Sequence, residues 1–167
     1  AAGSLVAAGR DWSAYVASRL QLPWHDRWMS SSFRAWVDVQ TWAAAHTPLD
    51  ARFATDPDEK GFRVFALRAP IVEVKDGAPI VFSREYALEW ERRMMALAET
   101  GVVDDDASEE KVSFSLEGLK MLHQIYPFDF VVGRRPQEAL HYSPIYSNSE
   151  YAVYAWPPPV QEDTSTR

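Results

Sequence analysis

A group of charged residues between positions 56 and 76 offers the clearest chemistry in the sequence. Its members are Arg63, Arg68, Lys75, Asp56 and Asp76. A guanidinium group is planar and donates two parallel hydrogen bonds, which suits a phosphate or a carboxylate. We therefore predict an anion-binding site at these residues. In the alternative interpretation the two arginines pair with Asp56, Glu73 or Asp76 and hold the loop, because buried arginines are usually paired.

The sequence shows few other patterns of catalysis or metal binding. The chain has no cysteine, which excludes disulfides, thiolate metal sites and cysteine nucleophiles. The four histidines have no metal-ligand spacing, and no Gly-x-Ser-x-Gly or Gly-x-Gly-x-x-Gly motif is present. A pair of carboxylates of the kind that hydrolases use stays an open alternative, because the fold and not the sequence spacing sets the distance between them. We predict no cofactor, no metal and no identifiable catalytic residue.

Composition narrows the class of protein. The 167 residues suit one globular domain, and 8 Phe, 7 Trp and 7 Tyr argue against intrinsic disorder. Lys and Arg number 17 against 24 Asp and Glu, so the net charge is -7. Nucleic-acid binders usually carry a basic patch for the phosphates, so we predict no nucleic-acid partner. No run approaches the roughly 20 apolar residues that span a bilayer.

Six of the seven tryptophans fall into two groups. Three lie on apolar faces of predicted helices and are expected in the core: Trp36, Trp42 and Trp90. Three others lie in less regular chain near the start: Trp12, Trp24 and Trp28. Amphipathic aromatic residues of that kind pack on membrane surfaces or on neighbouring domains. We therefore predict that the second group forms a docking surface.

Apolar spacing predicts three helices that would carry these residues. Apolar residues recur at spacings of three and four between Phe33 and Ala45, and Thr47-Pro48 ends that helix. Ser83 and Ser115 have the residue type of an N-cap at the start of the second and third helices. Gly101 is expected to end the second helix, and Pro127 to end the third.

The remaining apolar runs predict strands. Strands are expected at Ala51–Thr55 and Phe128–Val132, and at Phe62–Leu67 and Ile71–Val74, either as two strands or as one strand broken at Pro70. A tight turn is expected at Lys75–Gly77, and a hairpin of His141–Tyr146 with Tyr151–Trp156. The fold class is therefore α/β, with a single mixed sheet covered by helices and a C-terminal antiparallel hairpin at one edge. We divide the chain into an aromatic-rich segment 1–32, an α/β domain 33–156 and a tail 157–167. The anion site is expected near the carboxyl edge of the sheet.

Several segments together resemble a known family. They are the W…WA…TP.DA.F pattern of Trp36–Phe53, Gly61–Arg68, Lys75–Gly77, Phe128–Val132 and Ile145–Tyr154. Over about residues 33–156 the sequence resembles the C-terminal extracytoplasmic domain of bacterial multi-pass membrane proteins. Those proteins are similar in layout to polytopic glycosyltransferases that use lipid-linked sugars.

The resemblance implies a non-catalytic accessory domain on the periplasmic or extracellular face of a bacterial inner membrane. Its partner would be the membrane-embedded part of the same protein, and its ligand a saccharide or sugar phosphate. The first residue is Ala rather than Met, which leads us to expect a piece of that longer protein. Two alternatives stay open: a free-standing α/β enzyme or small-ligand sensor that uses the same arginines, and a purely structural docking module.

Overall fold

A computed structural model describes three stretches of the chain: residues 30–100, 114–135 and 140–159. The chain divides into two compact units, residues 1–34 and 35–167. In the first unit the Ser30 hydroxyl accepts a 3.2 Å hydrogen bond from the Phe33 N–H, and so caps the start of α2, Ser31–His46. The second unit contains the sheet.

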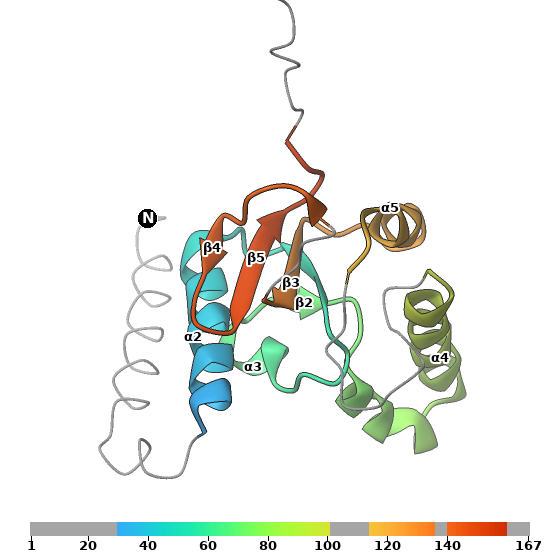
Figure 1. Cartoon of the computed structure of the whole chain (residues 1–167). Coiled ribbons are helices and arrows are strands. Elements are labelled where there is room, and N and C mark those ends of the chain that lie inside the picture. The colour runs from blue at the N-terminus through green and yellow to red at the C-terminus, as the bar shows by residue number, and fades with distance from the viewer. Residues whose placement is uncertain (1–29, 101–113, 136–139, 160–167) are drawn as a thin grey trace, which may run out of the picture. The chain divides into compact units, whose positions relative to one another are not determined.

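The second unit is built on one mixed sheet of five strands, in the order β2-β1-β3-β5-β4 (Figure 1). The strands are β1 Arg52–Thr55, β2 Ala69–Pro70, β3 Phe130–Arg134, β4 Tyr146–Ser147 and β5 Tyr151–Ala155. β1 runs parallel to both β2 and β3, whereas β5 runs antiparallel to β3 and β4. The predicted α/β class, with an antiparallel C-terminal hairpin at one edge, is confirmed.

Helices cover both faces of this sheet. The helices α2 and α3, Phe62–Phe65, pack with one set of strand side chains, and α4, Arg84–Glu99, and α5, Leu116–Ile125, pack with the other. The neighbouring residues Val131 and Val132 of β3 belong to opposite core clusters, as the alternation of a strand requires. Trp36 is buried, whereas Trp42 and Trp90 are half-buried against the two clusters.

Both predicted serine caps are confirmed. The Ser83 hydroxyl accepts from the Tyr86 N–H at 3.2 Å, and the Ser115 hydroxyl accepts from the Gly118 N–H at 3.0 Å. Gly118 is required for packing, because a Cβ there would lie 2.3 Å from the Thr100 carbonyl oxygen at the end of α4. Gly101 lies outside the described residues.

The strand predicted at Phe62–Leu67 is wrong. Residues Phe62–Phe65 form the single-turn helix α3, and Leu67 has a φ of 53°. The Glu73 carboxylate accepts from the Phe62 N–H at 2.9 Å and from the Gly61 N–H at 3.4 Å. These N–H groups at the start of a helix have no intrahelical partner, so a carboxylate from a distant residue stabilises the turn. The apolar alternation alone does not show that contact.

The strand predicted at Ile71–Val74 and the turn predicted at Lys75–Gly77 are also wrong. The strand is β2, which contains Pro70 and lies at the edge of the sheet. The 3₁₀ helix η1, Val74–Val81, includes the residues of the expected turn. It begins with a capping box in which the Glu73 N–H donates to the Asp76 carboxylate at 3.1 Å.

Two boundaries in the C-terminal part differ from the prediction. The strand β3 begins two residues later than the predicted Phe128–Val132. The strand β4 has only two residues, Tyr146–Ser147, and the predicted first residue, His141, has a φ of 56°, which an extended strand does not allow.

Candidate functional site

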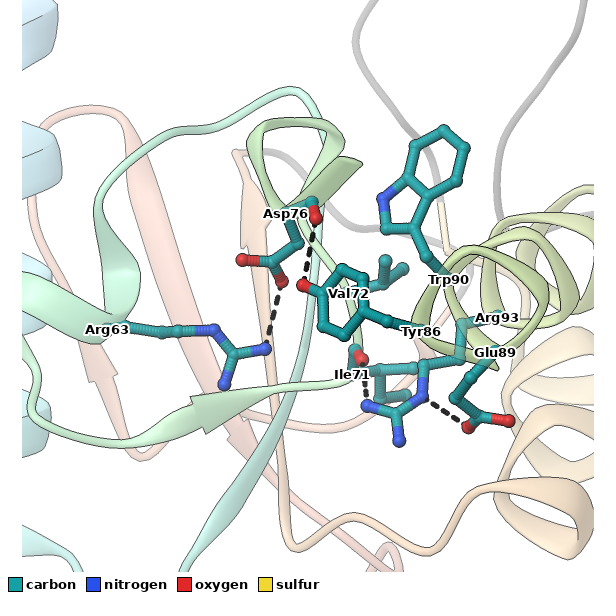
Figure 2. A pocket seen from close by; sticks show the side chains of 8 residues that line it. All are labelled: Arg63, Ile71, Val72, Asp76, Tyr86, Glu89, Trp90 and Arg93. Atoms are coloured by element: carbon teal, nitrogen blue, oxygen red, sulfur yellow. Dashed lines mark hydrogen bonds and ion pairs between the residues drawn. The ribbon is translucent and has the colours of Figure 1, made fainter. Parts of the chain in front are cut away.

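Two cavities lie beside β2. The first, which we call the aromatic cavity, has a volume of about 160 Å³ and is lined by Arg63, Ile71, Val72, Asp76, Tyr86, Glu89, Trp90 and Arg93 (Figure 2). The second, which we call the arginine cavity, has a volume of about 200 Å³ and is lined by Arg52, Arg63, Ala69, Pro70, Ile71, Arg93, Tyr126 and Pro127. Because they share Arg63, Ile71 and Arg93, the two cavities adjoin.

Arg63 lies between the cavities and uses only part of its guanidinium group. Its Nη2 donates to Asp76 Oδ2 at 2.9 Å (Figure 2) and to the Pro70 carbonyl oxygen at 3.5 Å. Its Nε and Nη1 have no hydrogen-bond partner among the described residues. The Asp76 pair therefore orients the guanidinium group and leaves two of its nitrogens for a ligand.

Arg93 of α4 is held in a similar way. Its Nε donates to Glu89 Oε1 at 2.7 Å, and its Nη1 donates to the Ile71 carbonyl oxygen at 3.0 Å. Within the part of the chain that the structure describes, Nη2 has no partner. The guanidinium group also lies 5.6 Å from the centre of the Tyr126 ring. These contacts fix the position of the Arg93 charge beside the cavity.

Arg52 completes the arginine cavity. It is the first residue of β1, and its backbone N–H donates to Asp129 Oδ2 at 2.9 Å. Its guanidinium group has no hydrogen bond or ion pair with any residue in the described stretches. Three arginines thus line one cavity, and among the described residues Arg63 and Arg93 have carboxylate partners whereas Arg52 has none. The cavity therefore favours an anion, although the chain has a net charge of -7.

The structure brings together some of the residues predicted as a site, and separates others. Arg63 and Asp76 both line the aromatic cavity, and they pair as the alternative interpretation expected. Lys75 is exposed on η1 and lines neither cavity, and Asp56 follows β1 at its other end. The arginine cavity includes Arg52, at the start of β1, and so does not lie at the expected carboxyl edge of the sheet.

Arg68 has a structural role in this fold and lines neither cavity. It is buried, and its Nη2 donates to the carbonyl oxygens of Ala44 at 3.0 Å and Thr47 at 2.7 Å. Its Nη1 donates to the Ala66 and Leu67 carbonyl oxygens at 3.3 and 3.1 Å. Burial lowers the pKa of Arg68 from its usual value. These four carbonyl groups lie near the end of α2 and directly after α3. Arg68 therefore joins the end of α2 to the turn after α3.

A second polar cluster, which we call the Glu59 cluster, lies at the other end of the sheet. Glu59 Oε1 accepts from Arg134 Nε at 2.9 Å and Nη2 at 2.5 Å, and from the Tyr151 hydroxyl at 2.5 Å. Burial, together with the Glu59 hydrogen bond, raises the pKa of Tyr151. Because Glu59 bonds to both Arg134 and Tyr151, the cluster joins the loop after β1 to β3 and β5.

The carboxyl group of Asp56 makes the stability of the fold depend on pH. Burial, and the nearby charges of Glu59 and Asp58, raise the pKa of Asp56 above 3.8, although its carboxylate accepts from the Asp58 N–H at 2.9 Å. The folded state therefore holds this proton more tightly than the unfolded state does. The resulting stability is present below the unfolded pKa and is lost as the pH rises through the folded pKa.

The Asp56→Asn variant removes that charge and keeps an oxygen acceptor for the Asp58 N–H. We expect it to be more stable than the wild type at pH 7 and to lose this advantage below pH 3.8. Urea unfolding at both pH values measures the difference. Glu91→Gln, which removes the same charge from an exposed position on α4, serves as the control. A gain that is equal at both pH values would contradict the assignment.

The residues that sequence reasoning missed are Arg52, Arg93, Tyr86, Glu89 and Trp90. Their signal in the sequence was only that of a strand start or of a helix, because α4 reaches the residues after β2 through tertiary packing, as the Arg93 bond to the Ile71 carbonyl oxygen shows. The predicted docking residues Trp12, Trp24 and Trp28 lie outside the described residues, so that prediction stays open.

Comparison with known proteins adds one similarity. A family described as a domain of unknown function, DUF6798, matches residues 34–97. No curated protein and no solved structure matches the chain. In the described stretches, no helix combines the length and the apolar character needed to cross a membrane. The DUF6798 match covers less than half of the chain, but it includes every residue that lines the aromatic cavity.

Proposed function

We propose that the second unit is a non-catalytic binding domain whose arginine cavity takes the anionic group of a ligand or partner. The observation that carries this proposal is the meeting of Arg52, Arg63 and Arg93 at one cavity of about 200 Å³. Hydrogen bonds from a cation to an anion are stronger than neutral ones, and a guanidinium group donates them in pairs.

The two paired arginines are already oriented for such a ligand. Asp76 and Glu89 hold Arg63 and Arg93 by short ion pairs, at 2.9 and 2.7 Å. Because these side chains are ordered before binding, less conformational entropy is lost when an anion arrives. Arg52 supplies the charge that no carboxylate partner in the described stretches offsets.

The setting implied by the family resemblance is part of this proposal. There the domain would be an extracytoplasmic accessory domain, its partner the membrane-embedded part of the same protein, and its ligand a saccharide or sugar phosphate that the domain guides or retains. The complete gene tests the setting. Apolar membrane spans encoded directly upstream of residue 1 support it, and a start codon followed by a cleavable signal near residue 1 contradicts it.

Titration with inorganic phosphate tests the cavity. We expect phosphate to shift the backbone amide NMR signals of the cavity residues, and Arg52→Ala to weaken its binding about tenfold, the loss of roughly 1.4 kcal/mol of a charge-assisted hydrogen bond. The substitution should leave the fold intact, because the Arg52 side chain is exposed and its backbone bond to Asp129 remains.

Arg84→Ala is the matched control. Arg84 lies in the first turn of α4, it is exposed, and it lines neither cavity. The control loses the same charge, so it reports the general effect of net charge on phosphate binding. If phosphate causes no shift, or if Arg52→Ala and Arg84→Ala weaken its binding equally, the proposed anion site is wrong.

A further inference from the structure

The two adjoining cavities differ in chemistry, and this difference bears on what else the ligand contains. The arginine cavity has three cationic side chains, whereas the aromatic cavity has Tyr86 and Trp90 beside Ile71 and Val72. A ligand that fills both therefore needs one anionic end and one end with apolar surface. A free inorganic anion would use only the arginine cavity.

The aromatic side chains are held rigidly. The Tyr86 hydroxyl donates to the Asp76 carbonyl oxygen at 2.8 Å (Figure 2). Trp90 Nε1 donates to the Glu73 carbonyl oxygen at 3.1 Å. The backbone of Gly77 lies so close to the Trp90 ring that an added Cβ would be 3.0 Å from it. Both rings are therefore already fixed as a wall when a ligand arrives.

Polar acceptors line the same cavity. Asp76 and Glu89 are already paired with Arg63 and Arg93, so they offer lone pairs but little uncompensated negative charge. Such acceptors suit neutral hydroxyl donors better than an ammonium group, which needs an unpaired counter-charge. The ligand portion here is expected to have apolar ring faces and hydroxyl groups at its edge.

The size of the aromatic cavity suits one ring. Its volume is about 160 Å³. An engineered protein cavity of about 150 Å³ is known to hold a benzene molecule, so one six-membered ring fits this space. Together the two cavities slightly exceed the lower limit of roughly 300 Å³ for small-molecule sites.

Building on the proposed function, we infer that the ligand is a single sugar ring that carries one anionic group. The ring lies in the aromatic cavity against Tyr86 and Trp90, and its hydroxyls donate to Asp76 and Glu89. The phosphate or carboxylate lies in the arginine cavity between Arg52, Arg63 and Arg93.

Calorimetric titration of the full chain tests this assignment. The probes are hexose 6-phosphates and hexuronates of gluco, galacto and manno configuration, with glucose, inorganic phosphate and acetate as their separate halves. We expect at least one sugar anion to bind tenfold or more tightly than the matching free anion, and the phosphate and carboxylate series distinguish the two kinds of anion. If inorganic phosphate binds and no sugar anion binds more tightly, the sugar inference fails while the proposed anion site stands; if none binds, both fail.

A pair of variants separates the two cavities. We expect Tyr86→Ala to weaken the best sugar anion about threefold to tenfold, the range of one lost aromatic contact, and to leave inorganic phosphate unchanged. Leu88→Ala, a similarly exposed apolar residue of α4 that lines neither cavity, should change neither. Tyr86→Leu replaces the alanine variant if the latter does not fold. An equal loss for phosphate and for the sugar anion would overturn the assignment of the ring to the aromatic cavity.

Discussion

The Arg68→Ala variant is expected to lose about 3 kcal/mol of unfolding free energy, because several carbonyl oxygens lose their donor together. The side chain is buried and bonds to the carbonyl oxygens of Ala44, Thr47, Ala66 and Leu67. Each carbonyl group that is left without a donor and shielded from water costs about 1–3 kcal/mol, and partial access to water reduces the total.

Urea unfolding followed by circular dichroism measures this loss. Arg68→Lys should recover only a small part of it, because one ammonium group cannot reach carbonyl oxygens on both sides as a planar guanidinium group does. The control is Arg84→Ala, which removes an exposed arginine from the first turn of α4. A loss below about 1 kcal/mol would show that these hydrogen bonds are replaced by water at little cost.

Replacing Glu59 by alanine is expected to cost about 2–4 kcal/mol. The variant removes the acceptor of the buried Tyr151 hydroxyl and the Glu59 carboxylate that pairs with Arg134. The Arg134 side chain is 34% exposed, so water compensates part of its charge, and the expected cost is lower than for a fully buried ion pair.

A double-mutant cycle identifies the source of that cost. In a Tyr151→Phe background the hydroxyl that needs Glu59 is already absent, so Glu59→Ala should cost about 1 kcal/mol less than it does in the wild type. Unfolding free energies of the four proteins measure the difference. Additive effects of the two substitutions would mean that the Tyr151 hydroxyl finds water when Glu59 is removed.

Local signals were enough to predict a large part of the fold. The caps Ser83 and Ser115 act within one helical turn, and the hairpin that contains β5 pairs segments close in the sequence. Apolar spacing likewise predicts α2 and its end before Pro48. In each of these cases the residues that decide the structure are near neighbours.

Contacts over longer distances explain what the sequence did not predict. The turn α3 depends on Glu73, which lies eleven residues beyond Phe62 and accepts its N–H. Arg68 binds carbonyl oxygens, and every residue has one, so no side-chain pattern shows this role. Arg63 was predicted as a site residue by its neighbours, but Arg52 and Arg93 reach the same cavity only because β1 pairs with β2 and Arg93 of α4 bonds to the carbonyl oxygen of Ile71, directly after β2.

The proline in β2 has a consequence for how this protein meets other molecules. Pro70 has no N–H to offer at the outer side of the sheet, and its carbonyl oxygen accepts from Arg63. The opposite margin, β4, is only two residues long. Neither margin is a good template for an added strand, so recognition by β-strand addition is disfavoured. The same two features should protect concentrated solutions of the domain from edge-to-edge growth into fibres.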